Sequence, residues 1–310
     1  MKEKTSNEES ISIVIPTYNR SETLKKVISS YLSQKKVKEI LIVNDGSTDN
    51  TDEFINSLKK KQPKIQYIEH QQNRGLPAAR NTGVKHSSGR YILFGEDDVI
   101  LADNYASQLL QCSKKTGADI LGGRGIFPYS NESFEEAIAR ADRFEGDLID
   151  QRFLRGNYLK RVSDDVPIVF LHACILVKKK VFNEIFYDEE YKGNAYREES
   201  DFCVEAGERG YKVYFCPHTM FFHLPHKVTT GGQRSRGVLS YRYWVLKNTH
   251  RFLRKHYPYL KEELKLKDSI WKLMLFQFFY ELAKTFTYFL RKYFPSAYSF
   301  LARKLNFLNW

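Results

Sequence analysis

The sequence predicts an α/β protein built on a mostly parallel central sheet. Over the first hundred residues, short strand-forming apolar runs alternate with helical patterns, and polar clusters follow three of those runs. Such alternation is typical of parallel strands joined by right-handed helical crossovers. In sheets of this kind, ligands bind beyond the carboxyl ends of the strands. The three polar clusters are therefore expected to meet at one edge of the sheet and form a ligand site.

The N-terminal elements are predicted from apolar periodicity and from helix-start signals. Apolar runs at residues 11–16, 39–43, 65–68 and 90–94 predict four buried strands. Helical patterns begin near residues 21, 48 and 77, and Pro77 suits the first turn of its helix. Further along, residues 118–127 are expected to pair as strands around a Gly-Gly step, 134–144 to form a helix, 166–177 a strand, 179–185 a helical segment, 198–207 a helix and 211–215 a strand.

Size, charge and cysteine usage limit the classes of protein. A chain of 310 residues can bury a sizeable core, and its net charge of +12 fits nucleic acid, anionic membrane or phosphorylated ligands without choosing among them. The four cysteines include no Cys-x-x-Cys pair, and a chain of this size needs no disulfides. Free buried thiols are therefore predicted. The polar first ten residues carry no secretory signal, so cytoplasmic residence is the default expectation.

Three consecutive carboxylates, Glu96, Asp97 and Asp98, end the strand at residues 90–94. Like charges side by side resist burial, so a sequence that keeps them usually has a cation to place between them. Hard oxygen ligands suit Mg²⁺ or Mn²⁺, which commonly carry phosphorylated substrates. The alternative is a solvated acidic turn.

Two further clusters permit both a binding and a purely structural interpretation. Residues 44–49 combine a tight turn at Gly46 with helix-capping side chains. Arg80 follows Pro77 near a helix N-terminus, where guanidinium and helix dipole together favour an anion such as a diphosphate. The structural alternatives are simple turn chemistry and a surface arginine.

A second acidic group begins the helix at residues 198–207. On a helix Glu198 and Asp201 share a face, and Glu199 points about 100° away. Acids at a helix start also complement the macrodipole, so a capping role competes with a catalytic one. His223 ends an aromatic run; such a histidine is more often structural, but neutral imidazole also joins carboxylates around a metal.

Taken in this order, the segments resemble the family 2 inverting glycosyltransferases of the GT-A fold. The resemblance covers about residues 10–225 and rests on residues 14–20, 43–49, 73–75 with 79–83, 96–98, 198–202 and His223. It implies a nucleotide-diphospho-sugar transferase fold, with a Rossmann-like, mixed but mostly parallel sheet flanked by helices. It also implies a donor half at residues 10–100 and an acceptor half at 101–225 of a catalytic domain spanning 1–225.

The resemblance assigns roles to individual residues. The nucleotide-sugar site would comprise Thr17, Tyr18, Asn19, Asp45, Arg80, Glu96 and Asp97, with Asp45 accepting from the base and Arg80 meeting the diphosphate. Asp98 would ligate Mn²⁺ or Mg²⁺, with His223 as a second ligand. Acceptor-facing residues are expected between positions 122 and 177.

Two departures from the family pattern affect these assignments. The catalytic base motif usually reads Glu-Asp, whereas the matching pair here is Glu198-Glu199. Glu199 is predicted as the base, and Glu198 and Asp201 stay candidates because glutamate is one methylene longer than aspartate. The metal triplet opens with Glu96 where aspartate is commoner.

The implied reaction moves a sugar from a nucleotide-diphosphate donor to a hydroxyl of a lipid-linked or surface glycan, with inversion by metal-assisted single displacement. A polyprenyl-phosphate sugar synthase is the alternative within the same fold. A sugar-nucleotidyltransferase would need a glycine-rich loop after the first strand, and Pro16-Thr17-Tyr18 is not one. A non-enzymatic basic aromatic module for membrane or nucleic acid would not require a second acid cluster, so no nucleic-acid partner is expected. A homo-oligomer stays open.

Residues 226–310 are predicted to form a lid-like loop, at 226–236, and a basic aromatic helical extension. The apolar stretch at 273–290 is interrupted by Gln277, Glu281 and Lys284, so it is too short to span a bilayer and shows no clean one-sided pattern. Aromatic residues beside Arg291 and Lys292 are the ingredients of an interfacial segment. Peripheral attachment to the inner face of the membrane is therefore expected, with packing on the protein or on a second subunit as the alternative.

Overall fold

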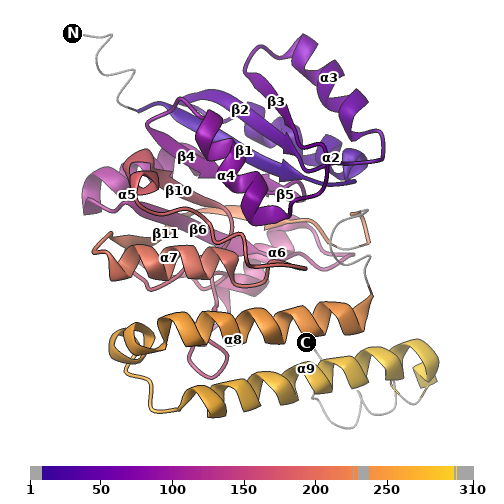
Figure 1. Cartoon of the computed structure of the whole chain (residues 1–310), viewed down its shortest axis with the longest axis vertical. Helices are drawn as coiled ribbons and strands as arrows, with labels where there is room; N and C mark the ends of the chain where they lie inside the picture. Colours follow the sequence, from indigo (N-terminus) through magenta and orange to yellow (C-terminus); the bar gives the residue numbers. More distant parts are fainter. Residues whose placement is uncertain (1–8, 226, 230–236, 297, 299–310) are drawn as a thin grey trace.

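The computed structural model describes residues 9–225, 227–229, 237–296 and 298. Among them, nine strands form one mixed sheet in the order β3-β2-β1-β4-β10-β6-β11-β5, with β9 paired to β11 (Figure 1). The strands are β1 (Ile11–Thr17), β2 (Val37–Asn44), β3 (Ile65–Glu69), β4 (Tyr91–Phe94), β5 (Val99–Leu101), β6 (Ile120–Ile126), β9 (Val166–Pro167), β10 (Ile175–Lys178) and β11 (Val213–His223). A separate ribbon pairs β7 (Ile149–Asp150) with β8 (Arg155–Gly156).

The four predicted N-terminal strands are confirmed as β1 to β4, and they are mutually parallel. Strand β10 runs antiparallel to both neighbours, β4 and β6, and β11 is parallel to β6. The carboxyl ends of β1, β2, β4 and β11 therefore lie at the same edge of the sheet. This arrangement brings the polar clusters that follow these strands together.

Helices cover both faces of the sheet (Figure 1). They are α2 (Ser21–Leu32), α3 (Thr51–Lys61), α4 (Leu76–His86), α5 (Tyr105–Thr116), α6 (Phe134–Asp142), α7 (Glu198–Glu208), α8 (Val238–Glu263) and α9 (Ile270–Tyr293). Alternate residues of β1 point to opposite faces: Ile13 joins a core with α2, α3 and α5, whereas Val14 joins a core with α4, α7 and α8. Both faces of the sheet are thus buried, which explains the uninterrupted apolar runs.

The middle of the chain differs from the prediction in three places. Residues 118–127 contain one strand, β6, rather than a strand pair around the Gly-Gly step. The apolar run at 166–177 is divided between β9 and β10, and residues 179–185 form only a 3-10 turn (η1, Lys179–Asn183). Periodicity predicted the apolar character correctly, but it could not show that Phe170 and Leu171 enter the core from a loop.

The C-terminal helices share a core with the central sheet. Helix α8 lies beside α7, and α9 runs antiparallel to α8 on its other side (Figure 1). Phe252, Leu253, Leu260 and Leu273 belong to the same buried cluster as residues of β1, β2 and β4. No described helix is both long enough and apolar enough to cross a membrane. Most of the expected lid, residues 226 and 230–236, lies outside the described residues.

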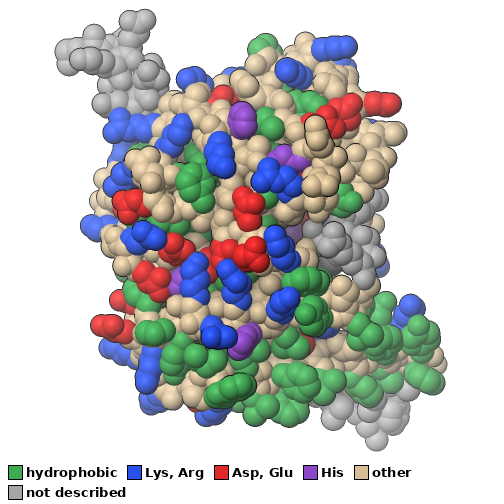
Figure 2. Space-filling view, in the orientation of Figure 1, with side chains coloured by type: hydrophobic (Ala, Val, Ile, Leu, Met, Phe, Trp, Pro, Cys, Tyr) green, Lys and Arg blue, Asp and Glu red, His purple; other side chains and the backbone are tan. Residues whose placement is uncertain are grey.

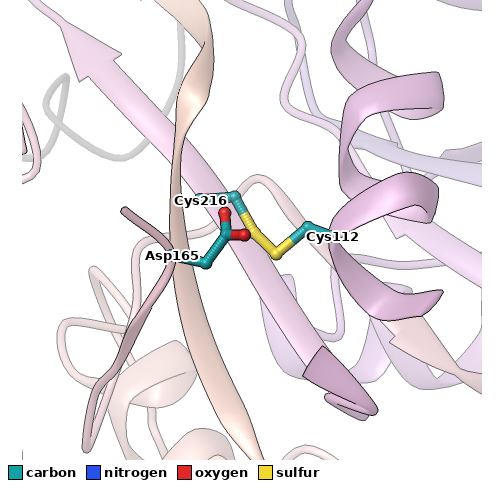
Figure 3. A group of neighbouring side chains, drawn as sticks. All are labelled: Cys112, Asp165 and Cys216. Atoms are coloured by element: carbon teal, nitrogen blue, oxygen red, sulfur yellow. A yellow bond between two sulfur atoms is a disulfide. The ribbon is translucent and has the colours of Figure 1, made fainter. Parts of the chain in front are cut away.

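The cysteines correct the prediction of four free thiols. Cys112 on α5 and Cys216 on β11 form a disulfide, with Asp165 beside it (Figure 3). The two residues are 104 positions apart in the sequence, and their Cα atoms lie 6.6 Å apart because α5 packs against β11. Spacing along the chain gave no indication of this proximity. Cys174 and Cys203 are buried free thiols, as predicted.

Candidate active site

A cavity of about 230 Å³ opens at the carboxyl ends of β1, β2, β4 and β11. Its lining includes five of the predicted nucleotide-sugar residues, Thr17, Tyr18, Asp45, Glu96 and Asp97, and both predicted metal ligands, Asp98 and His223. The first turn of α4 and Tyr241 of α8 complete the wall. The topology of the sheet therefore unites residues that are more than two hundred positions apart.

Asp45 is held by the loop that precedes α4. Its carboxylate accepts hydrogen bonds from His70 Nδ1 at 2.7 Å and from the backbone N–H groups of Arg74 at 2.9 Å and Gly75 at 2.8 Å. A carboxylate has about four lone-pair sites, so one acceptor position is left for a ligand in the cavity. Gly46 permits this close approach, because a Cβ there would lie 2.7 Å from the backbone N of Asn73.

Arg20, at the start of α2, neutralises part of the acidic triplet. Its Nη1 lies 2.8 Å from Asp97 Oδ1 and 2.5 Å from Asp98 Oδ2, and the hydroxyl of Thr17 donates to Asp97 Oδ2 at 2.9 Å. Burial raises the pKa of Asp97 to about 6, and the charge of Asp98 adds to the shift, while Arg20 opposes it. Part of the positive charge expected among these carboxylates is thus supplied by the guanidinium of Arg20.

Glu96, Asp98 and His223 offer ligand atoms that all lie within 4.8 Å of one another. Strand β5 follows Asp98 and pairs with the end of β11, so His223 Nε2 comes within 3.5 Å of Asp98 Oδ1. Burial raises the pKa of Glu96, and the charge of Asp98 adds to the shift. Two carboxylates and an imidazole suit Mn²⁺ or Mg²⁺. The structure thus groups Glu96, rather than Asp97, with Asp98 and His223.

Glu96 is also fixed through its backbone. The hydroxyl of Tyr31 on α2 donates to the carbonyl oxygen of Glu96 at 2.8 Å and accepts from its N–H at 3.1 Å. A Cβ at Gly95 would lie 2.5 Å from the Tyr31 ring, so the residue before the triplet has to be glycine. This packing sets the direction in which the three carboxylates leave β4.

Arg80 differs from its predicted role at the diphosphate. Its side chain is fully buried, Nε donates to Glu198 Oε1 at 2.8 Å, and the guanidinium lies over the rings of Phe94 and Tyr187. Ala79 lines the cavity, and the next helical residue points about 100° away from it, into the core. Arg80 in this structure therefore positions Glu198 and does not reach the cavity.

Asn19 also differs from its predicted role. Its side-chain oxygen accepts from the backbone N–H groups of Thr48 at 2.7 Å and Asp49 at 3.3 Å, and it is absent from the cavity wall. Asn19 thereby ties the loop after β1 to the loop after β2. Its left-handed backbone, with φ of 52°, suits asparagine in such a turn.

Glu199 lies in a second cavity of about 340 Å³, next to the first. Tyr241 lines both cavities, and Phe127 of the second stacks on His223 of the first, with ring centroids 5.5 Å apart. Burial raises the pKa of the half-buried Glu199. The predicted base is therefore close to the metal candidates, although the chain separates them by about a hundred residues.

The other two base candidates are occupied by partners. Asp201 accepts from the Tyr191 hydroxyl at 2.8 Å, from Lys255 at 2.9 Å and from His256 Nε2 at 2.8 Å, so it anchors α8 to α7 and does not line either cavity. Glu198 is paired with Arg80, and burial raises its pKa although Arg80 opposes the shift. Of the three acids, Glu199 is the one that lines the second cavity.

Sequence reasoning missed several residues of the two cavities. Arg20 and Asn73 lie in the motifs at residues 14–20 and 73–75, but the family resemblance gives them no role. His70 orients Asp45, with its Nε2 bonded to the Thr82 hydroxyl at 2.9 Å, and its position at the end of β3 was the available signal. Tyr241 and His172 carried no signal in the sequence, because they reach the cavities from α8 and from the loop between β9 and β10.

Comparisons with known proteins agree with this geometry. The sheet and its helices have the GT-A fold. The family model described as Glycosyl transferase family 2 matches residues 12–186, and the chain belongs to that family. Curated relatives that are described as glycosyltransferases agree with this membership.

Two relatives and one solved structure show the extent of the similarity. Glycosyltransferase GlyA of Streptococcus pneumoniae is 31% identical over 220 residues, which are 69% of this chain and 29% of GlyA. GalNAc(5)-diNAcBac-PP-undecaprenol beta-1,3-glucosyltransferase of Campylobacter jejuni is 29% identical over 208 residues, 66% of this chain and 65% of that enzyme. The chain thus spans less than two thirds of either relative. The structure of S. aureus TarS 1-349 matches with a TM-score of 0.52 and 16% identity over 84% of this chain and 75% of that one, a similarity of fold.

Proposed function

We propose that this chain is an inverting glycosyltransferase that moves a sugar from a nucleotide-diphosphate donor to a hydroxyl of a lipid-linked or surface glycan. The observation that carries the proposal is the pair of adjoining cavities. One contains Asp45 and the candidate metal ligands, the other contains Glu199, and Tyr241 lines both. A donor in the first cavity and an acceptor in the second would meet at their junction.

Glu199 is the proposed general base. Its carboxylate would take the proton of the acceptor hydroxyl while that oxygen attacks the anomeric carbon from the side opposite the nucleotide. A single displacement of this kind inverts the anomeric configuration. Partial burial suits the role, because it raises the pKa of Glu199 toward the operating pH.

The donor would lie across the ends of β1, β2 and β4. Thr17, Tyr18 and Asp45 would contact the base, with the free acceptor position of Asp45 toward a ring N–H. Glu96, Asp98 and His223 would hold Mn²⁺ or Mg²⁺. The bound cation would neutralise charge on the departing diphosphate. Because Arg80 is buried, Arg20 is the arginine that lines the donor cavity.

The outer face of α9 supports attachment to a membrane surface. Its exposed side chains repeat at helical spacing and are large and apolar: Trp271, Leu275, Phe278, Phe279, Leu282, Phe286 and Tyr293. Apolar side chains gather over α8 and α9 in Figure 2. Arg291 and Lys292 follow in the last turn, and aromatic rings beside cations suit an anionic bilayer surface. The Campylobacter relative is named for an undecaprenol-linked acceptor, which agrees with an acceptor at the membrane.

A donor screen tests the proposed function. Release of nucleoside diphosphate would be measured for a panel of nucleotide sugars with Mn²⁺ and with EDTA, first without acceptor and then with lipid-linked glycans. We expect one donor to be turned over only with the metal, and the product to have the inverted configuration by NMR. Retention of configuration, or turnover that EDTA does not affect, would contradict the proposal.

A further inference from the structure

The second cavity carries more positive charge than the proposed base requires. Its lining includes four cations, Arg155, Arg197, Arg242 and Lys284, and two carboxylates, Glu199 and Glu281. His172, which also lines it, is kept neutral because burial lowers its pKa to about 4, although the hydrogen bond between Nε2 and the carbonyl oxygen of Gly123, at 2.7 Å, opposes the shift. The cavity is therefore cationic, which suits an anionic group on the molecule that enters it.

The four cations differ in the hydrogen-bond and ion-pair partners that the protein provides for them. Arg197 donates to the backbone carbonyls of Phe153 and Leu154, so it is used by the fold. Arg155 and Arg242 share one carboxylate, that of Glu281, at 3.5 Å and 2.6 Å, and the buried Nε of Arg242 has no partner. Lys284 lies 4.5 Å from the Tyr280 ring centroid, and no carboxylate of the described residues forms an ion pair with it.

Helix α9 contributes Glu281 and Lys284 to the cavity from one face and carries exposed apolar side chains on the opposite face. Glu281 points inward and is 3% exposed, and Lys284, three residues later, shares its face of the helix. Leu282 and Phe286, two residues before and after Lys284, lie on the opposite, outer face and are 53% and 64% exposed. Lys284 thus lies on the side of α9 that lines the cavity, and the apolar residues lie on the other side of the same helix. If the outer face of α9 lies on a bilayer, the cavity is next to the bilayer surface, where the phosphate that joins a glycan to a membrane lipid also lies.

We propose that the second cavity binds a phosphate group of the acceptor through Lys284, Arg155 and Arg242, while the acceptor hydroxyl lies at Glu199. The inference rests on the proposed function, since it names the acceptor class of the same site. Arginine forks fit phosphate oxygens in two parallel hydrogen bonds, and lysine adds a point charge. The outer face of α9 favours a lipid-linked phosphate over a phosphate within a polyol chain.

Calorimetry of the full chain with farnesyl diphosphate, in EDTA, tests the proposal without turnover. EDTA removes the metal on which diphosphate binding in the donor cavity depends. Farnesol is the uncharged control, and sn-glycerol 3-phosphate tests a phosphate without a lipid. We expect farnesyl diphosphate to bind more tightly than farnesol, and K284A to weaken its binding about tenfold, which corresponds to ~1.4 kcal/mol.

K272A is the matched variant. Lys272 also lies on α9, pairs with Asp268 and is absent from the cavity wall, so its removal should leave binding of farnesyl diphosphate unchanged. Equal binding of farnesyl diphosphate and farnesol, or equal losses in K284A and K272A, would overturn the proposal. Binding of sn-glycerol 3-phosphate as tight as that of farnesyl diphosphate would support the phosphate site and overturn the preference for a lipid.

The outcome is independent of the donor screen. If no donor is turned over but K284A weakens diphosphate binding, the proposed function fails and the anion site stands. If a donor is turned over but farnesyl diphosphate binds no better than farnesol, the glycosyltransferase assignment stands and the phosphate-bearing acceptor is rejected.

Discussion

At the scale of single residues, the acids at the two cavities differ in their partners, and those partners separate their roles. Asp201 is held by three donors and Glu198 by Arg80, whereas Glu199 lines a cavity. Asp97 is bonded to Thr17 and Arg20, whereas Asp98 also approaches Glu96 and His223. Two substitution pairs test these distinctions.

Replacing Glu199 with glutamine should remove the base and keep the shape of the cavity. We expect E199Q to lower kcat by about 10²- to 10⁴-fold, with little change in the Kd for the donor. Glu205→Gln is the control, because Glu205 lies on the same helix and pairs with Arg209 and Lys255 outside both cavities. If the kcat of E199Q is within about threefold of the wild-type kcat, Glu199 is excluded as the base.

Replacing Asp98 with asparagine should remove a metal ligand. In wild type, Mn²⁺ is expected to tighten donor binding measured by calorimetry, and D98N should lose most of that gain. Asp97→Asn should keep the tighter donor binding with Mn²⁺, because the candidate metal site consists of Glu96, Asp98 and His223 and does not include Asp97. Equal losses in both variants would show that the pair acts together rather than through Asp98.

At the scale of elements, α8 is docked on α7 by a buried charge cluster. His256 lies between Asp201 at 2.8 Å and Glu208 at 2.9 Å, so both ring nitrogens have a carboxylate to which to donate. Burial lowers the pKa of His256, but the hydrogen bond to Asp201 and the charges of both acids raise it above its usual value overall. The docked form therefore favours the imidazolium.

The sign of the pH dependence follows from the raised pKa. The stability that protonated His256 contributes should be fully present below its unfolded pKa of about 6.5 and lost as the pH rises through the higher folded value. We expect His256→Gln to lower the free energy of unfolding by ~1–3 kcal/mol near pH 6, with the difference from wild type shrinking toward high pH. Urea titrations across pH measure it; a difference that grows with pH would contradict the imidazolium.

On helix α9 two polar residues face the protein and large apolar residues face outward, which is the reverse of the usual arrangement on a surface helix. The sequence shows Gln277 and Glu281 as interruptions of an apolar stretch, yet in the structure both are buried against the protein and the aromatic residues are outside. Glu281 can be buried because Arg155, Arg242 and Gln277 bond to it. The helix therefore packs on the rest of the protein through one face and leaves the other exposed.

Flotation with anionic liposomes tests the outer face. Truncation near Tyr257 would remove core residues of α8, so substitution is the sharper test. Phe286→Glu, at a side chain that is 64% exposed, should lower membrane binding by about tenfold or more, since burying a phenylalanine contributes ~1.5–3 kcal/mol. Tyr129→Glu, at an exposed aromatic residue away from α9, should not change it. Equal flotation of wild type and F286E would remove the membrane assignment.

At the scale of the whole molecule, the disulfide connects α5 to the strand that ends in His223. A cross-link between residues so far apart in the sequence strongly restricts the unfolded chain. It typically adds ~2–4 kcal/mol to the stability of the folded protein. We expect dithiothreitol to lower the urea midpoint of wild type, and the double variant C112S/C216S to show the lowered midpoint without it. Thiol titration of the denatured, unreduced protein should find two free thiols, those of Cys174 and Cys203; four would exclude the bridge.

The sequence by itself determined the α/β class, the first four strands and the polar clusters at their ends, because these depend on local periodicity and on turn chemistry. It also indicated Asp45, Asp98, His223 and Glu199 as candidates, since each lies at a strand end or begins a helix within a recognisable motif, and all four line the two cavities. The direction of parallel strands then made their proximity predictable.

Only the tertiary structure decided which of these residues face a cavity and which face the core. Arg80 turned inward to Glu198, Arg20 took the place beside Asp97 and Asp98, and Asp201 became an anchor for α8. Each outcome depends on a partner far away in the chain, about eighty positions for Arg20 and over a hundred for Arg80. Local patterns carry no information on such partners, because burial and charge pairing are settled by packing between elements rather than within them.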